Sequence, residues 1–432
     1  MKRLVALLLF VALAAPAAAT AHATLKSEFP GFQQELQTSP KFVQLHFDQV
    51  VQLPVIDVID IHGVNHALKA VANGTNVRAR VRPLPAGAYT IRWHALSSDG
   101  HVVSGVWTFG LRVKAPPPTE AYGASGPTGT ENLVRWVYFV ALATMIGALG
   151  FRLLVLRGLE VPPALEKRML LLAFIGVLGV LEVGIAAFLL RCEDVLQLPF
   201  GKFFYGDLSP ISGGTRYGKA FIAMTLGFAL VSAFVYLAWL LERTLLLAPA
   251  LVLSLAFTGG LSLSGHDATD PGSSWKSELA DWVHISAVSL WIGGLVALVV
   301  AVFPAAPGLR REVLARFSRF ATVLVALVLA AGTYLAIVRL PAFHDLWRNG
   351  YGQVLLVKIC LVAVAVAWGG VHKFFPRARV FRSIAGEMAV GLAVLLVAAI
   401  LTDSKPPPQP VPSSSTSRSA YAGAVGASSW RK

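Results

Sequence analysis

Long apolar stretches decide the fold, and residues 281–303 are an example that reads DWVHISAVSLWIGGLVALVVAVF. A helix needs about 20 mainly apolar residues to cross the hydrocarbon core of a bilayer. The ionisable residues of this stretch, Asp281 and His284, are confined to its first turn. The stretch therefore predicts a helix that spans a membrane.

Seven further stretches of similar length and character occur after residue 132. The whole chain of 432 residues is 55% hydrophobic and only 14% charged, whereas soluble domains carry roughly 25% charged residues. We therefore predict an all-α membrane domain over 133–403 with eight spans. Their approximate limits are 133–156, 169–190, 218–241, 244–264, 281–303, 320–339, 352–372 and 383–402.

The formal net charge of +14 comes from basic residues in short turns between the apolar stretches. That placement is typical of membrane topology and excludes a nucleic-acid partner. If the segment before the first span is outside, thirteen basic residues lie in inner loops and seven in outer ones. The inner set is Arg152, Arg157, Lys167, Arg168, Arg243, Arg310, Arg311, Arg316, Arg319, Lys373, Arg377, Arg379 and Arg382.

The first 21 residues have the pattern of a secretory signal peptide: a basic start, an apolar stretch, and small residues at Ala19 and Ala21. Cleavage after Ala21 makes His22 the first residue of the exported chain. A terminal amine and an imidazole on one residue form a chelating pair that suits Cu(II). The alternative is cleavage two residues away, which makes His22 an ordinary exposed side chain.

Residues 22–113 alternate short apolar runs with Pro, Gly and Asn turns. This period-two pattern predicts an all-β sandwich of Greek-key, immunoglobulin-like type. A linker rich in Pro and Gly follows at 114–132, and we expect the tail at 404–432 to be disordered and on the same side of the membrane as the sandwich.

Asp99 and His101 are two residues apart, so on a strand both side chains leave the same face. Together with the amine and imidazole of His22 they offer three nitrogens and one carboxylate oxygen, a set that matches the tetragonal preference of Cu(II). The alternative is an ordinary loop pair beside the turn residue Gly100.

The stretch Asp99–Phe109, which reads DGHVVSGVWTF, resembles the CopC copper-binding domain, as do the His22 start and the β-rich segment. The eight-span remainder resembles CopD, and fusions of the two occur in copper-handling proteins. The resemblance implies Cu(II) ligands at His22, Asp99 and His101. It also implies a bacterial inner membrane location, a periplasmic sandwich and tail, and a periplasmic copper donor as partner.

The sulfur content of the sandwich departs from some CopC domains, because there is no methionine between Met1 and Met145. Cu(I) prefers thioether ligands, so we expect this domain to bind Cu(II) alone and keep Cu(I) as a candidate cargo of the membrane domain. The two cysteines, Cys192 and Cys360, are not expected to form a disulfide. A second metal site from His46, His62, His66 and His94 is an alternative; we interpret them as strand or loop residues without metal.

The membrane domain has candidate copper residues near its outer side: His266, Asp267, Asp281 and His284. They resemble a CopD signature, although an interfacial histidine or a solvated loop pair is the simpler alternative. Ionisable residues inside spans are costly unless paired, so Glu182, Lys358 and Glu387 are candidate pathway residues, with His372 further inward. Depth favours an ion pair of Lys358 with Glu182 over Glu387, and such a pair could instead be purely structural.

These observations favour a copper-handling membrane protein that captures Cu(II) outside and moves copper across the membrane, inward. The chain has no nucleotide-binding or phosphorylation motif, so we expect neither ATP-driven pumping by this chain nor enzymatic activity. The alternatives are a membrane redox protein that ligates haem through paired histidines and a copper sensor or storage module without transport.

Overall fold

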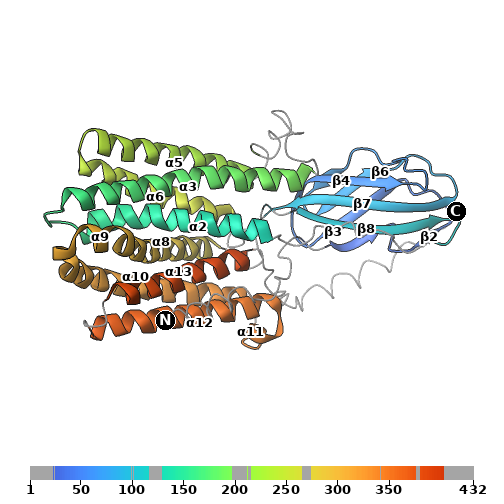
Figure 1. Ribbon diagram of the computed structural model, residues 1–432. Helices are drawn as coiled ribbons and strands as arrows, with labels where there is room; N and C mark the ends of the chain where they lie inside the picture. Colours follow the sequence, from blue (N-terminus) through green and yellow to red (C-terminus); the bar gives the residue numbers. More distant parts are fainter. Residues whose placement is uncertain are drawn as a thin grey trace, which may run out of the picture.

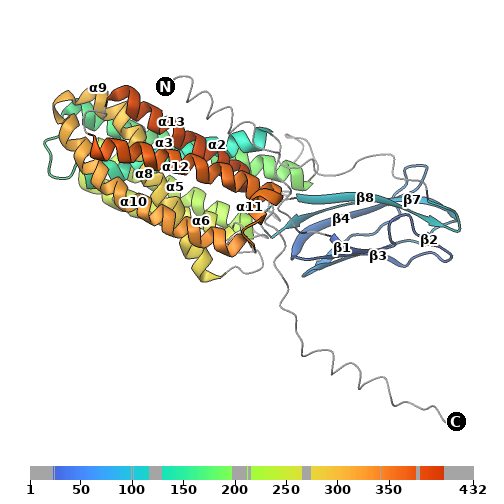
Figure 2. The same cartoon turned by 90° about the horizontal axis from the view of Figure 1, so that it is seen from below.

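The computed structural model describes residues 23, 25–98, 100, 102–115, 129–196, 212, 216–264, 274–340, 342–375 and 380–402. These residues form a β-sandwich and a bundle of long helices. The sandwich lies beyond one end of the bundle, in line with the helix axes, in both views (Figures 1 and 2).

The sandwich consists of two four-stranded sheets, ordered β1-β3-β6-β5 and β2-β8-β7-β4. All pairings between these strands are antiparallel except that of β2 with β8. The strands are β1 (Leu25–Phe29), β2 (Glu35–Leu36), β3 (Phe42–Phe47), β4 (Val51–Ile59), β5 (Val71–Asn73), β6 (Asn76–Arg80), β7 (Gly87–Ser97) and β8 (Val102–Leu111).

Alternation along each strand places one set of side chains between the sheets. On β3, Val43, Leu45 and Phe47 are buried while the residues between them are not. Phe47 packs edge-on against Trp93 of the other sheet, with ring centroids 5.2 Å apart. The predicted all-β sandwich is confirmed, and the period-two pattern located its strands correctly.

The bundle is built from long helices, and short helical turns lie between some of them. Its elements are α2 (Gly129–Gly150), η1 (Phe151–Val155), α3 (Pro163–Leu196), α5 (Arg216–Leu240), η2 (Thr244–Leu246), α6 (Leu247–Ser264), α8 (Trp275–Ala297), η3 (Leu298–Val302), α9 (Phe303–Ala305), η4 (Pro307–Leu309), α10 (Arg310–Arg339), α11 (Asp345–Arg348), α12 (Gly350–Phe374) and α13 (Phe381–Thr402).

Within the described residues, eight helices are long and apolar enough to cross a membrane. Each corresponds to one of the eight predicted stretches, so the prediction of eight spans is confirmed, although 133–156 and 218–241 run one residue past the ends of their helices. Several helices extend past the apolar limits: α3 begins at Pro163 and α8 at Trp275. The reason is that hydropathy detects only the part of a helix that fits the hydrocarbon layer, while polar end turns can continue beyond it.

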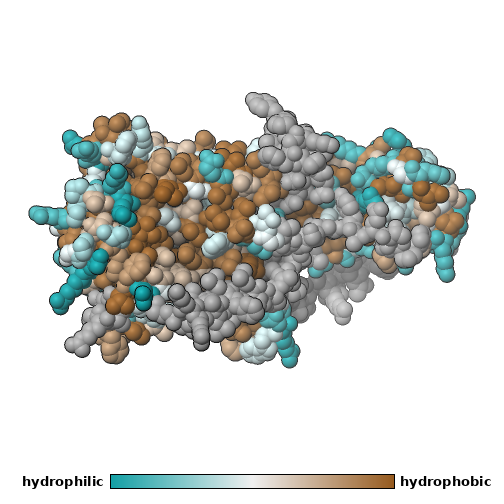
Figure 3. Space-filling view, in the orientation of Figure 1, coloured by the Kyte–Doolittle hydropathy of each residue, from teal (hydrophilic) through white to brown (hydrophobic). Residues whose placement is uncertain are grey.

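The bundle has an inner layer and an apolar outer surface. Helices α2, α8 and α13 are mostly buried, and α2 crosses α8 where Gly147 meets Gly293, a small-residue contact typical of packed membrane helices. Large apolar side chains such as Leu226, Val252 and Ile337 are about two-thirds exposed. Figure 3 shows the resulting hydrophobic surface over the helices, with hydrophilic residues at the end away from the sandwich.

We call the end of the bundle next to the sandwich the sandwich end, and the opposite end the distal end. Helix α3 ends and helices α5 and α8 begin at the sandwich end, while α12 ends and α13 begins at the distal end (Figure 1). The described helix ends that flank the predicted inner loops therefore lie at the distal end.

Candidate functional site

The tip of the β7–β8 hairpin is the part of the sandwich that faces the bundle. The last paired residues of the hairpin are Leu96 and Val102. Within the tip, the backbone N–H of Gly100 donates to the carbonyl of Ser97 over 3.0 Å. Gly100 has a φ of +85°, a left-handed conformation that favours glycine.

The beginning of the described chain lies beside this tip. The backbone N–H of Ala23 donates to Oγ of Ser97 over 3.3 Å, and both residues are almost fully buried. Ala23 thus connects the beginning of the described chain to Ser97 at the end of β7, 74 positions later in the sequence.

The three predicted copper ligands of the sandwich, His22, Asp99 and His101, lie outside the described residues. Their described neighbours in the sequence are Ala23, Gly100 and Val102. All three neighbours belong to the hairpin tip or contact it. Adjacent Cα atoms are about 3.8 Å apart, so each predicted ligand is one residue away from this part of the sandwich, and the ligand set stays a prediction.

An apolar cluster joins the hairpin tip to the bundle. Leu96 and Val102 pack with Phe188 and Cys192 of α3, and the partly buried residues around them are Leu53, Leu189, Tyr217 and Phe221. Phe188 stacks on Phe221 of α5 with ring centroids 4.1 Å apart. We call this group of residues the docking cluster.

Tyr217, in the first turn of α5, lies against Gly100. A Cβ added to Gly100 would stand 2.8 Å from two atoms of the Tyr217 ring, closer than real Cβ contacts allow. Residue 100 therefore needs to be glycine both for its backbone conformation and for this contact. Gly100, which separates two of the predicted ligands in the sequence, therefore rests on the sandwich end of the bundle.

His284 lies inside the bundle, nine residues from the first residue of α8. Its Nδ1 is 3.2 Å from the carbonyl of Val328 on α10, so Nδ1–H donates to that carbonyl. A Cβ on Gly332 would stand 3.1 Å from Cε1 of the same ring. A histidine fixed through Nδ1 keeps Nε2 available as an acceptor or metal ligand, an arrangement common among metal-binding histidines.

The other predicted residues near the sandwich end are only partly described. Asp281 precedes His284 by one turn on α8, as predicted, and Lys358 of α12 is near enough for its charge to act on the His284 ring. His266 and Asp267 lie outside the described residues.

The predicted ion pair between Glu182 and Lys358 is wrong. Glu182 is exposed on the outer surface of α3, which packs on α2 and α5, whereas α12 packs on α13 and α10. Depth along a span had favoured the pair, but depth does not specify which way a helix face points.

Glu387 instead pairs with His372 near the distal end. Nδ1 of His372 is 2.6 Å from Oε2 of Glu387, and both side chains are buried. Nε2 of His372 is 2.7 Å from Oγ of Ser383, which also accepts from Nε1 of Trp368 over 3.0 Å. Sequence analysis named Glu387 and His372 but not their contact. Helical spacing alone could not supply it, because the residues belong to different helices.

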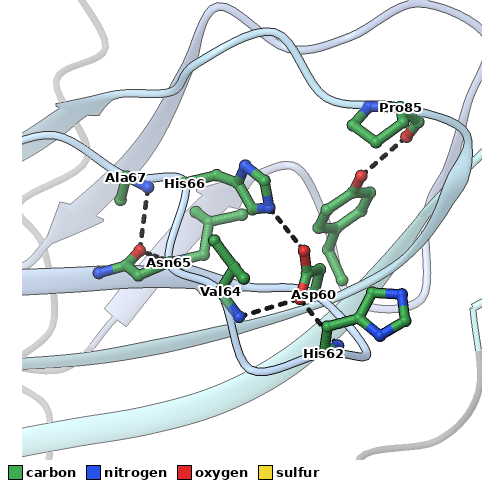
Figure 4. A network of polar contacts seen from close by, with 9 residues as sticks. Asp60, His62, Val64, Asn65, His66, Ala67 and Pro85 are labelled. Atoms are coloured by element: carbon green, nitrogen blue, oxygen red, sulfur yellow. Dashed lines mark hydrogen bonds and ion pairs between the residues drawn. The ribbon is translucent and has the colours of Figure 1, made fainter.

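Two of the histidines considered for a second site in the sandwich, His46 and His66, have side-chain hydrogen-bond partners. Figure 4 shows His66, whose Nε2 is 2.8 Å from Oδ2 of Asp60, in a loop closed by backbone N–H groups of His62 and Val64. These hydrogen bonds, the one with His66 foremost, lower the pKa of Asp60 to about 2. His46 contacts Asn76 instead.

His94 is buried on β7, where it pairs with Val55 of β4. Val55 is five residues before Asp60, so His94 is far from the Asp60 loop. In the part of the chain that the structure describes, no three His, Cys, Asp or Glu residues form a group that could hold a metal ion. Both cysteines are free thiols, Cys192 buried and Cys360 exposed.

The fold defines a multi-pass membrane protein with a β-sandwich docked on one end of its helices. Residues 25–112 match the CopC domain, residues 131–276 the N-terminal domain of copper resistance protein D-like proteins, and residues 311–401 copper resistance protein D. The chain belongs to the copper resistance family and joins its CopC and CopD parts in one polypeptide.

Relatives match either the whole chain or the sandwich. The copper transport protein CutJ of Bacillus subtilis (strain 168) is 27% identical over 92% of this chain and 76% of its own length. Copper resistance protein C of Pseudomonas syringae pv. tomato is 33% identical over 22% of this chain and 85% of its own length. The crystal structure of CopC from Methylosinus trichosporium OB3b is 27% identical, covering 23% of this chain and 97% of that one, with a TM-score of 0.20.

Proposed function

We propose that this protein handles copper: the sandwich captures Cu(II) through His22, Asp99 and His101, and the helical bundle moves copper across the membrane, inward. The contact of Gly100 with Tyr217 carries the proposal, because Gly100 is the residue between Asp99 and His101 in the sequence and lies against the sandwich end of the bundle. A copper ion leaving the loop would have only a short distance to travel to the helices.

The ligand chemistry supports the capture step. An amine, two imidazoles and a carboxylate provide three nitrogens and one oxygen, a set suited to Cu(II). The hydrogen bond between Ala23 and Ser97 supports the inclusion of His22, because it holds the next residue against the hairpin that carries the other two ligands.

His284 supports the transfer step. It is a histidine of α8 in the half of the helix nearer the sandwich end. Its ring orientation is fixed by the hydrogen bond to Val328 and by the close approach of Gly332. Asp281 lies one turn nearer the sandwich on the same helix, and we propose that Asp281, with His266 and Asp267, helps to receive the ion. Because Glu182 is exposed outside the bundle, we omit it from the path.

The distribution of basic residues supports the orientation. Thirteen basic residues belong to the predicted inner loops or the helix turns beside them, against seven in the outer ones, and the described parts of those inner loops lie at the distal end. Cytoplasmic loops carry the excess of Lys and Arg in membrane proteins, so we propose that the sandwich is periplasmic and that copper moves toward the distal end.

Two measurements on the purified full-length protein test the two steps separately. For capture, Cu(II) affinity is measured for a chain that begins at His22 and for one with a single added glycine before it. We expect the added residue to weaken binding at least tenfold because it removes the chelating amine; equal affinity would contradict the ligand set.

For transfer, copper uptake is measured in vesicles that contain the wild type or the double variant His266→Ala, His284→Ala. The matched control is His344→Ala, an exposed histidine outside the proposed path. We expect the double variant to lose most uptake and the control to retain it. Equal uptake by all three proteins would exclude this path.

A further inference from the structure

The buried pair of His372 and Glu387 is a second polar site, separate from the sandwich and from His284. We call His372, Ser383 and Glu387 the distal cluster. His372 is two residues from the end of α12, and Glu387 is six residues from the start of α13. At about 1.5 Å per residue, both lie within roughly 10 Å of the distal ends of their helices.

The hydrogen bonds of the distal cluster suit both protonation states of the histidine. When the ring is neutral, Nδ1–H donates to the Glu387 carboxylate and Nε2 accepts from the Ser383 hydroxyl. When the ring is an imidazolium, both nitrogens donate, and Ser383 Oγ can accept from His372 and from Trp368 together. Only the hydroxyl hydrogen has to rotate, so no heavy atom has to move.

The two protonation states differ in net charge. A neutral ring beside a carboxylate leaves a buried charge of −1, which attracts a cation, whereas an imidazolium–carboxylate pair is neutral. Isolated buried charges are costly in a membrane protein. The cluster is therefore a place where a proton and another cation can replace one another.

Within the described ranges, which leave out 376–379, the charged groups around the cluster do not balance the charge of Glu387. Along the helices packed on α12 and α13, the acidic residues of α2 and α8 lie near the sandwich end, and Glu312 of α10 pairs with Arg316. Lys373 donates to Thr322 of α10, and Arg319 and Arg382 are exposed. Arg310 contacts Phe303. Among the described residues, these cations lie at the distal end without an ion pair to Glu387, whose partner is His372.

We propose that the distal cluster is a proton-binding site that compensates the charge of the transported cation. As copper approaches, the N–H bond at Nε2 of His372 breaks, the proton leaves to water at the distal face, and Nε2 then accepts from Ser383. When copper has left, a proton from the same water re-forms the N–H bond. The compensating role rests on the proposed copper transport, whereas proton binding by the cluster does not.

Proton binding is tested without copper. The purified full-length protein, with labelled histidine, is titrated by infrared spectroscopy, and difference spectra against His372→Gln assign the ring of His372. We expect these difference spectra to show that the His372 ring binds and releases a proton in the wild type, and that the midpoint of this change differs in Glu387→Gln. The control Glu160→Gln, an exposed loop residue, should match the wild type.

Ser383→Ala gives a second variant in case Glu387→Gln does not fold. It removes the Nε2 partner without changing any charge, and we expect it to shift the same midpoint, while Ser383→Thr, which keeps the hydroxyl, should restore it. A His372 ring that does not titrate in the wild type, or a midpoint unchanged in both Glu387→Gln and Ser383→Ala, would overturn the proposal.

Charge compensation is tested in vesicles with the sandwich outside, by measuring copper uptake at several interior pH values. We expect uptake by the wild type and Glu160→Gln to depend on interior pH, and uptake by Glu387→Gln to be independent of it. The same pH dependence in Glu387→Gln would overturn the compensating role. If the wild type takes up no copper, the proposed transport fails, while the infrared titration still decides whether the cluster binds a proton.

Discussion

Gly100 at the tip of the β7–β8 hairpin lies directly against the ring of Tyr217 at the start of α5. The contact joins two parts of the chain that differ completely in composition, a sandwich and a membrane bundle. It depends on the absence of a side chain at residue 100, and the docking cluster of apolar residues surrounds it.

Gly100→Ala should loosen the docking of the sandwich on the bundle. The added Cβ would overlap the Tyr217 ring, and the positive φ adds roughly 1 kcal/mol of backbone strain. We expect faster amide hydrogen exchange at the β7–β8 tip and in the first turns of α5. Gly63→Ala is the matched control, because Gly63 has a φ of +81° with open space around it. Equal exchange at the tip in both variants would contradict a docking role.

Ser97→Ala should weaken Cu(II) binding by the sandwich without unfolding it. The change removes the acceptor of the Ala23 N–H, and such a hydrogen bond contributes about 1 kcal/mol, or roughly fivefold in affinity. Ser39→Ala is the control, since Ser39 Oγ accepts a comparable bond from Leu84 elsewhere in the sandwich. Titration with Cu(II) should separate the two variants, and identical affinities would argue against a ligand next to Ala23.

Gly332→Val should reduce copper uptake by displacing the His284 ring. A Cβ at residue 332 already stands 3.1 Å from that ring, and valine adds two methyl groups. Overpacking of this kind costs about 1–3 kcal/mol when neighbours cannot move. Gly370→Val on α12, where no atom lies within 4 Å of the added Cβ, is the control. Uptake that falls equally in both variants would point to a general effect on the bundle.

The sandwich should lose stability as the pH falls toward 2. The folded-state pKa of Asp60 is about 2, below its ordinary value of 3.8. The stabilisation is therefore fully present above pH 4 and is lost as the pH falls through the folded pKa. Asp60→Asn should remove this part of the pH dependence between 4 and 2, whereas Asp48→Asn should keep it. Hydrogen exchange at residues 57–66 as a function of pH measures the difference.

The sequence predicted the architecture well because both halves have strong periodic signals. Eight apolar stretches correspond to eight helices, and alternation on β3 identified buried Val43, Leu45 and Phe47. Contacts between helices were not predictable in the same way. Glu182 and Lys358 have similar depths but lie on helices that do not pack together, and the partner of Glu387 is His372 of α12.

For the candidate copper site in the sandwich, the sequence predicted only which residues could be ligands, from their residue types and from the resemblance to CopC. Spacing would place Asp99 and His101 on one face only if they lay on a strand, whereas β7 ends at Ser97 and β8 begins at Val102. Nothing local in the sequence indicated that Ala23 would bond to Ser97 or that Gly100 would contact Tyr217. Those relationships arise from tertiary packing between segments more than 70 residues apart.

The sandwich is held to the bundle twice, once by the covalent chain and once by the docking cluster. Two sites joined in this way meet at an effective concentration that is set by geometry, of roughly millimolar order for short connections. For an ion bound in the hairpin tip, the local ion concentration at the helices would then depend on whether the tip is occupied. It would depend hardly at all on the ion concentration of the surrounding solution.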